Sequence, residues 1–179
     1  MNIVLIGYRG TGKSTVGKQL AEKCHRVFYD TDDLVERHCG QSIGSMIDEK
    51  GWDFFRKREK EAVRRLLQVH GVVIATGGGV VLDRENVDRL KQRGFLIWLD
   101  ADVQTIIRRI EADSAGKQQR PPLSGHGLNE ETMTLLQERI PFYRRAADFS
   151  VDTTNRPVGE IVDEIYRRVK EVLACQEAP

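Results

Sequence analysis

The sequence is poor in the features that mark secreted, membrane-spanning and nucleic-acid-binding proteins. Its three cysteines, Cys24, Cys39 and Cys175, are widely spaced and form no Cys-x-x-Cys pair, so we expect neither a disulfide framework nor a zinc site. No apolar run approaches about 18 residues, which argues against a transmembrane helix. The 28 lysines and arginines nearly balance the 27 acids, and the net charge of +1 offers no broad basic surface for nucleic acid or an anionic membrane.

Linkers, internal repeats and a targeting segment are lacking as well. No stretch rich in proline, glycine and serine divides the 179 residues, a length that suits one well-buried core, so we expect 1–179 to be a single domain. An apolar strand starts at Asn2, so we expect no signal peptide and a soluble, cytoplasmic protein. The four histidines show no ligand spacing and are expected at the surface or in loops.

The strongest positive signal is the segment from Gly7 to Ser14, which matches the phosphate-binding pattern G-x-x-x-x-G-K-[ST]. A β-branched run precedes it and helical apolar spacing follows it, as that loop requires. Glycines let the backbone approach phosphates closely, and the helix that starts near Lys13 directs free N–H groups at the same anion. Lys13 would reach the β- and γ-phosphates, and the Ser14 hydroxyl would bind Mg²⁺.

Apolar runs alternate with helical patterns along the rest of the chain. This order predicts an α/β fold with five parallel strands covered by helices on both faces, in three layers. The expected strands are 2–6, 26–30, 72–75, 95–99 and 149–151, and the expected helices are 13–24, 34–38, 41–50, 53–67, 83–91, 103–110, 129–146 and 158–173.

Acids follow two of the expected strands, at the sheet edge where ligands bind. Asp30 and Asp32 are two residues apart, and in an extended segment both side chains would point the same way, one toward a metal and the other toward a substrate hydroxyl. Asp33 is expected mainly to cap the next helix. Asp100 also ends an apolar strand, so Asp30 and Asp100 compete for the role of second metal ligand.

Two further stretches carry candidate ligand groups. The three consecutive glycines Gly77, Gly78 and Gly79 follow a strand, and such backbone freedom suits the close approach of a small polar ligand. Residues 111–127 are polar and lack periodicity, which is typical of a lid. In that segment Arg120, beside Pro121 and Pro122, is the candidate for an arginine carried to the γ-phosphate.

Taken together, the motifs resemble those of the shikimate kinases, small phosphate-loop enzymes similar in fold to the nucleoside monophosphate kinases. The resemblance covers nearly the whole chain, although the family's lid commonly reads Arg-Pro-Leu, whereas here Pro122 stands before Leu123. The motifs that carry it are Gly7-x-x-Gly10-x-Gly12-Lys13-Ser14-Thr15, Asp30-x-Asp32, Phe55-Arg56-x-x-Glu59, Thr76-Gly77-Gly78-Gly79, Arg120-Pro121 and Arg139-x-Pro141-x-Tyr143-Arg144.

The resemblance implies ATP- and Mg²⁺-dependent transfer of the γ-phosphoryl group to the 3-hydroxyl of shikimate by a monomer. It gives catalytic roles to Lys13, Asp32 and Arg120, and metal binding to Ser14 and Asp30. Shikimate would contact Asp32, Arg56, Arg139 and the main chain of Gly77, Gly78 and Gly79. ATP would contact Gly10, Thr11, Gly12, Lys13, Ser14, Thr15 and Arg120, with Arg109 and Arg156 bordering the adenine.

Two other functions stay open at this point. A gluconate-type sugar acid kinase has the same fold and also needs arginines for a carboxylate. A non-catalytic module would bind the nucleotide without transfer. Such a module could lose the groups that bind an acceptor, yet Asp32, Arg56 and Arg139 are all present here.

Overall fold

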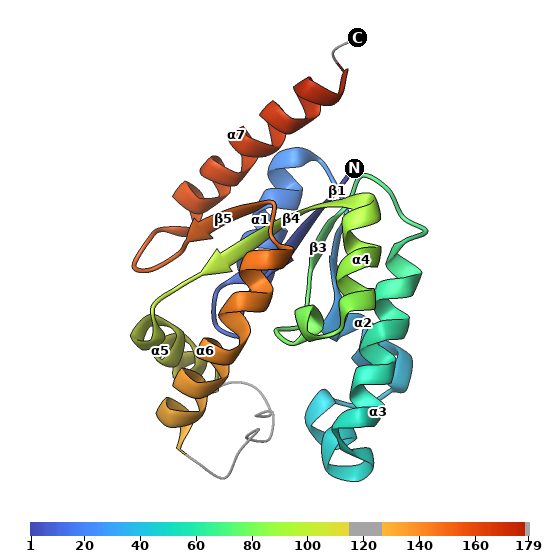
Figure 1. Ribbon diagram of the computed structural model, residues 1–179, viewed down its shortest axis with the longest axis vertical. Coiled ribbons are helices and arrows are strands. Elements are labelled where there is room, and N and C mark those ends of the chain that lie inside the picture. The colour runs from blue at the N-terminus through green and yellow to red at the C-terminus, as the bar shows by residue number, and fades with distance from the viewer. Residues whose placement is uncertain (115–126, 178–179) are drawn as a thin grey trace.

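The computed structural model describes residues 1–114 and 127–177, and its centre is a five-stranded, wholly parallel sheet (Figure 1). The strand order is β2-β3-β1-β4-β5, so the strand that leads into the phosphate loop lies in the middle. The strands are β1 (Asn2–Ile6), β2 (Phe28–Asp30), β3 (Val73–Ala75), β4 (Gly94–Asp100) and β5 (Phe149–Asp152). All five expected strands are confirmed, with ends that shift by one or two residues.

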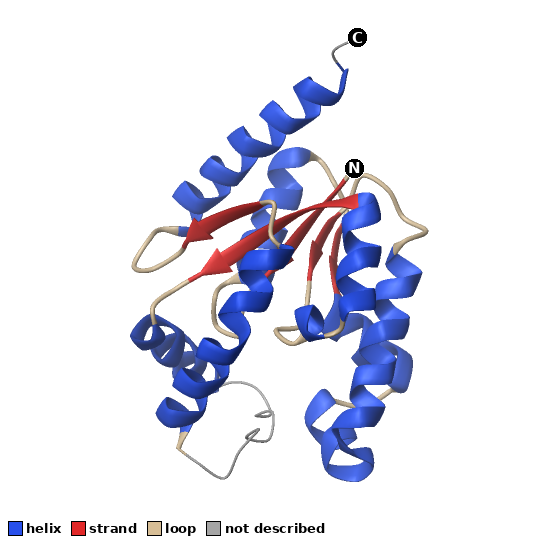
Figure 2. Cartoon of the chain, in the orientation of Figure 1, coloured by secondary structure: helices blue, strands red, loops and turns tan. Residues whose placement is uncertain are grey.

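Helices cover both faces of the sheet, which confirms the three-layer α/β/α prediction (Figure 2). The helices are α1 (Lys13–Cys24), α2 (Thr31–Cys39), α3 (Ile43–Leu66), α4 (Arg84–Arg93), α5 (Val103–Ser114), α6 (Leu128–Ala146) and α7 (Val158–Glu177), with a short 3-10 helix at Val80–Leu82. No helix in the described part of the chain is long and apolar enough to cross a membrane.

Alternation along β1 divides the core between the two faces. Ile3 and Leu5 pack with α1 and α7, whereas Val4 and Ile6 pack with side chains of α3, α4 and α6. All five residues of β1 are buried, as expected of a parallel strand covered on both sides. A third apolar cluster joins α2 to α3.

The chain after β2 differs from the prediction. Helix α2 starts at Thr31 rather than near residue 34, and its N-cap is Asp30, whose carboxylate accepts the Asp32 N–H at 2.9 Å. The expectation that Asp33 caps this helix is therefore wrong, and Asp32 lies in a helical first turn rather than in an extended segment. A carboxylate that can bond an N–H two residues ahead starts the helix earlier than hydrophobic spacing indicates.

Two helix boundaries also bear on the predictions. Gly51 has φ +78° and ψ 170° inside α3, so the chain turns between the two helices expected at 41–50 and 53–67. Residues 111–114, which were assigned to the lid, continue α5 instead.

The cap of α4 provides a stability test. Asp83 accepts the N–H groups of Glu85 at 2.8 Å and Asn86 at 3.4 Å. Asp83→Ala should lower the free energy of unfolding by about 1 kcal/mol, the usual loss for an N-cap acid. The control is Asp88→Ala in the same helix, where a loose, exposed ion pair with Arg84 should contribute less than about 0.5 kcal/mol. Equal losses in urea unfolding would contradict the capping role.

Candidate functional site

The phosphate loop connects β1 to α1 and is held against the sheet by close backbone packing. Gly7 has φ +143°, and a Cβ there would collide with the Leu99 carbonyl oxygen at the end of β4. Helix α1 starts at Lys13 with no side chain bonded to its first N–H groups. A helix N-terminus without such a cap keeps its N–H groups and its positive dipole end available to an anion.

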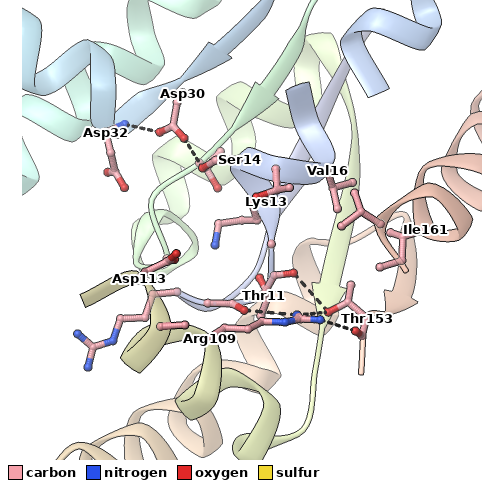
Figure 3. Close-up of a pocket in the computed structure, with 18 residues that line it drawn as sticks. Thr11, Lys13, Ser14, Val16, Asp30, Asp32, Arg109, Asp113, Thr153 and Ile161 are labelled. Atoms are coloured by element: carbon pink, nitrogen blue, oxygen red, sulfur yellow. Dashed lines mark hydrogen bonds between the residues drawn. The ribbon is translucent and has the colours of Figure 1, made fainter. Parts of the chain in front are cut away.

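Lys13 is buried and is kept in place by the loop. Its Nζ donates to the Tyr8 carbonyl at 2.7 Å, and the Thr11 hydroxyl donates to the same oxygen at 2.8 Å. Figure 3 shows the Lys13 side chain extending into the pocket beside Ser14. A buried ammonium group held at the phosphate loop suits a group that binds phosphate.

Ser14 and Asp30 meet at the same pocket from α1 and β2. The Ser14 hydroxyl donates to Asp30 Oδ2 at 2.6 Å, and Asp30 Oδ1 accepts the Asp32 N–H (Figure 3). A hydroxyl and a carboxylate are hard oxygen ligands, and Mg²⁺ usually takes one or two of these besides waters and phosphates. The donor set therefore fits Mg²⁺, even though no three His, Cys, Asp or Glu side chains gather as a metal cluster in the described residues.

Asp100, the competing metal ligand, lies elsewhere. Its Oδ1 accepts the N–H of Ala101 at 2.9 Å, and it is not among the residues that line the pocket. The geometry therefore favours Asp30, which the sequence alone could not separate from Asp100.

The electrostatics of Asp30 are unfavourable in the absence of a cation. Burial raises the pKa of its carboxyl group above the usual value, and the nearby charge of Asp32 raises it further, while the bond from Ser14 acts in the opposite direction. A bound cation would offset this penalty. Because Asp30 also faces Ser14 at the pocket, its raised pKa supports a role in ligand binding beside its role as the N-cap of α2.

One cavity joins the phosphate loop to the acids that follow β2 and to the glycines that follow β3. Its volume is about 390 Å³. Besides residues 9–16 of the loop and helix, it is lined by Asp30, Asp32, Thr76, Gly78, Arg109, Ala112, Asp113, Thr153, Val158 and Ile161. Nucleotide and acceptor candidates therefore border the same space.

Arg56 and the triple glycine pack together at the acceptor end. Arg56 Nη1 lies 2.7 Å from Glu59 Oε2, and Glu59 is 1% exposed. A Cβ on Gly79 would overlap the Arg56 guanidinium, and one on Gly77 would meet Glu59 Oε1 at 2.5 Å and Asp32 Oδ1 at 2.9 Å. Side chains are absent here because these three groups occupy the space.

Arg139 reaches the same glycines from α6. It is 7% exposed, its Nη1 donates to the Gly78 carbonyl at 3.4 Å, and it has no carboxylate partner among the described residues. The Tyr143 hydroxyl donates to the same carbonyl at 2.5 Å. Arg56 and Arg139 thus approach the glycine loop from α3 and α6, and the buried carboxylate of Glu59 pairs with Arg56.

The two arginines assigned to the adenine differ in their contacts. Arg109 donates to the Thr153 hydroxyl at 3.0 Å and to its carbonyl at 2.7 Å, and it borders the pocket (Figure 3). Arg156 is bonded to Glu164 at 2.7 Å and to the Asp152 carbonyl, outside the pocket lining. Arg120, Pro121, Pro122 and Leu123 lie outside the described residues.

Sequence reasoning missed one ion pair that joins the loop to α6. Arg9 Nη2 lies 2.7 Å from Glu131 Oε1, and the Glu131 side chain is 1% exposed. The two residues are 122 positions apart, so no local pattern could reveal the contact. The Arg56–Glu59 pair lies within one helical turn, and that spacing could have been found.

Comparisons with known proteins point to one family. The family model described as "SKI: Shikimate kinase" matches residues 9–170. A curated shikimate kinase from Syntrophus aciditrophicus is 47% identical over 175 residues, covering 93% of this chain and 90% of the relative. The solved shikimate kinase from Acinetobacter baumannii in complex with shikimate has a TM-score of 0.85 at 31% identity, covering 99% of this chain and 95% of that one.

A gluconokinase from Sinorhizobium meliloti is also similar in structure, with a TM-score of 0.61, covering 99% of this chain and 97% of that one. Its sequence is 20% identical, so this likeness shows the fold alone.

The raised pKa of Asp30 predicts a stability difference. An acid whose folded-state pKa is raised weakens the fold as the pH rises through that pKa, and has no such effect below the ordinary carboxyl value of 3.8. Without nucleotide or Mg²⁺, Asp30→Asn should therefore be more stable than wild type in urea at pH 7, with a difference that shrinks toward pH 3.8. Asparagine also caps helices well, so the cap is kept.

The control is Asp33→Asn in the same first turn, where the side chain is exposed. Loss of a negative charge near a helix N-terminus should lower its stability by about 0.3–1 kcal/mol. An Asp30→Asn protein less stable than wild type at pH 7 would refute the electrostatic argument.

Proposed function

The chain belongs to the shikimate kinase family, whose members transfer phosphate from ATP to a hydroxyl of shikimate, and we propose that its cavity holds both of these substrates. The observation that carries the assignment is the continuity of that cavity, which runs from Lys13 and Ser14 to Asp32 and Gly78. The attacking hydroxyl is proposed to be the 3-hydroxyl, and the products are shikimate 3-phosphate and ADP.

The phosphate loop is proposed to bind the nucleotide through main-chain N–H groups at the start of α1. Lys13 would exchange its bond to the Tyr8 carbonyl for the β- and γ-phosphates, where a charged partner makes a stronger bond. Contacts to ATP are assigned to Gly10, Thr11, Gly12, Lys13, Ser14, Thr15, Arg109, Arg120 and Arg156. Arg156 would contribute from the loop that includes Thr153.

Ser14 and Asp30 would hold Mg²⁺, the first as a direct ligand and the second through its hydration shell. When bound there, Mg²⁺ would supply positive charge that offsets the charge developing on the transferred phosphoryl group. The 2.6 Å contact between the two side chains supports the proposal, because both oxygens already face one point.

Asp32 is proposed to accept the hydrogen bond of the attacking hydroxyl. It borders the cavity and lies against Gly77, next to the loop that would meet the other ring hydroxyls. Because phosphoryl transfer has a loose transition state, orientation of the oxygen matters more than early removal of its proton. Arg120, on the proposed lid at 111–127, would neutralise the γ-phosphate.

Arg56 and Arg139 are proposed to bind the shikimate carboxylate, with main-chain groups of Gly77, Gly78 and Gly79 at the ring. A guanidinium pairs with a carboxylate through two parallel hydrogen bonds. The charge balance supports this assignment: two guanidinium groups approach Gly78 and Gly79, and Glu59 neutralises one of them.

We further propose that residues 1–179 form a single domain that works as a monomer in the cytoplasm. Its partner would be a small molecule rather than nucleic acid or a membrane, in keeping with a net charge of +1.

The reaction can be tested by ADP release from Mg-ATP with shikimate, gluconate, nucleoside monophosphates or no acceptor, at equal concentrations. Release that depends on shikimate alone is expected. Release with gluconate instead would identify a sugar acid kinase, and ATP binding without acceptor-dependent release would identify a non-catalytic module.

The carboxylate clamp can be tested with Arg139→Ala. Loss of a charged hydrogen-bonding partner should weaken shikimate binding on the order of 10- to 100-fold while nearly sparing ATP, as measured by calorimetric titration. Arg145→Ala, an exposed arginine of the same helix, is the matched control and should change neither affinity. Equal losses for both ligands, or none for shikimate, would overturn the assignment.

A further inference from the structure

Tyr8 is the second residue of the phosphate loop, at a position that the loop pattern leaves free. It continues the alternation of Val4 and Ile6, so its side chain enters the cluster on the α3, α4 and α6 face of the sheet. The residue is 1% exposed, and its buried hydroxyl has no hydrogen-bond partner among the described residues. A buried hydroxyl without a hydrogen bond destabilises the fold, because its desolvation is not compensated.

A second buried tyrosine in the same cluster has the hydrogen bond that a buried hydroxyl usually makes. Tyr143 is 0% exposed, and its hydroxyl donates to the Gly78 carbonyl at 2.5 Å. Phenylalanine at position 8 would supply the same apolar surface as Tyr8 without the penalty. The Tyr8 hydroxyl is therefore available to a partner beyond the groups of the described residues.

The groups around Tyr8 are those of the proposed acceptor site. The Arg139 guanidinium lies over its ring, 5.5 Å from the ring centre. Burial raises the pKa of Tyr143, and the neighbouring groups that also act on that pKa are Arg139, Tyr8 and Arg56. Tyr8 thus belongs to one polar cluster around Gly78, in which Arg56 pairs with Glu59 and Arg139 donates to the Gly78 carbonyl.

We propose that the Tyr8 hydroxyl is a third ligand of the acceptor's carboxylate, beside Arg56 and Arg139. The inference rests on the proposed function, in which these arginines bind that carboxylate. A phenol donates one hydrogen bond, and a carboxylate has about four acceptor sites, so two guanidinium groups do not exhaust it. Arg139 covers the ring and is bonded to Gly78 only at 3.4 Å, a long and weak contact that a carboxylate can displace.

Tyr8 also links the two halves of the site. Its carbonyl oxygen accepts Lys13 Nζ at 2.7 Å, and its ring lies beneath Arg139. The residue that contacts the proposed phosphate-binding lysine through its backbone would therefore contact the acceptor through its side chain.

The test is Tyr8→Phe, which removes one oxygen and leaves the ring under Arg139. Shikimate affinity, titrated by calorimetry, should fall about 10-fold or more, as for the loss of a hydrogen bond to a charged group. ATP affinity should stay within twofold of wild type. The melting temperature without ligands should be unchanged or higher, because an unpaired buried hydroxyl is lost.

Tyr143→Phe is the matched control, since its hydroxyl has a protein partner. It should lower the melting temperature, the opposite of Tyr8→Phe. Shikimate affinity within twofold of wild type in Tyr8→Phe would overturn the proposal and indicate an idle or water-bound hydroxyl. A lower melting temperature in Tyr8→Phe would also overturn it, because the hydroxyl would then have a structural partner.

Shikimate methyl ester locates the contact. The ester has no carboxylate charge but keeps a carbonyl acceptor, so the loss of affinity in Tyr8→Phe should be clearly smaller for the ester than for shikimate, and an undiminished loss would place the hydroxyl at another part of the acceptor. Arg139→Ala in the same titrations separates the two proposals. Loss of shikimate binding in Arg139→Ala but not in Tyr8→Phe would leave the clamp intact and remove Tyr8 from it, whereas no loss in either would overturn both.

Discussion

Close approach of main chains at the carboxyl edge of the sheet is the constraint on which the site depends. Gly7 packs against the end of β4 where no Cβ fits, and Gly79 leaves room for the Arg56 guanidinium. The strand order puts β1, β3 and β2 side by side, so the loops that follow them are neighbours. Phosphate-binding, ring-binding and acidic groups therefore meet without any long connection to carry them.

The same edge of the sheet gathers charged and polar groups whose burial is unfavourable. The pKa of Asp30 is raised by burial and by Asp32, Arg139 has no carboxylate partner in the described chain, and the Tyr8 hydroxyl lacks a bond. Other charges at this edge are paired within the protein: Arg9 with Glu131, and the proposed substrate ligand Arg56 with Glu59. Groups whose charge or hydroxyl is left uncompensated therefore gather where the substrates are proposed to bind.

Features that show as residue spacing were predictable, and features set by a single hydrogen bond or by distant contacts were not. The phosphate loop and the five strands follow from spacing within a few residues, so their positions were expected closely. The start of α2 was not, because a single bond from Asp30 outweighs the hydrophobic pattern. The choice between Asp30 and Asp100 needed the contact with Ser14, and the Arg9–Glu131 pair spans 122 positions with no sequence signal.

The central place of β1 also has a consequence for synthesis on the ribosome. Its two neighbours in the sheet come much later in the chain: Ile3 pairs with Val73 on one side and with Phe95 on the other. Val73 follows Ile3 by 70 residues, so at about 5–20 residues per second the strand emerges about 4 to 14 seconds before either partner exists. During that interval the nascent chain carries an apolar strand with both edges open, and it is then a natural client for chaperones.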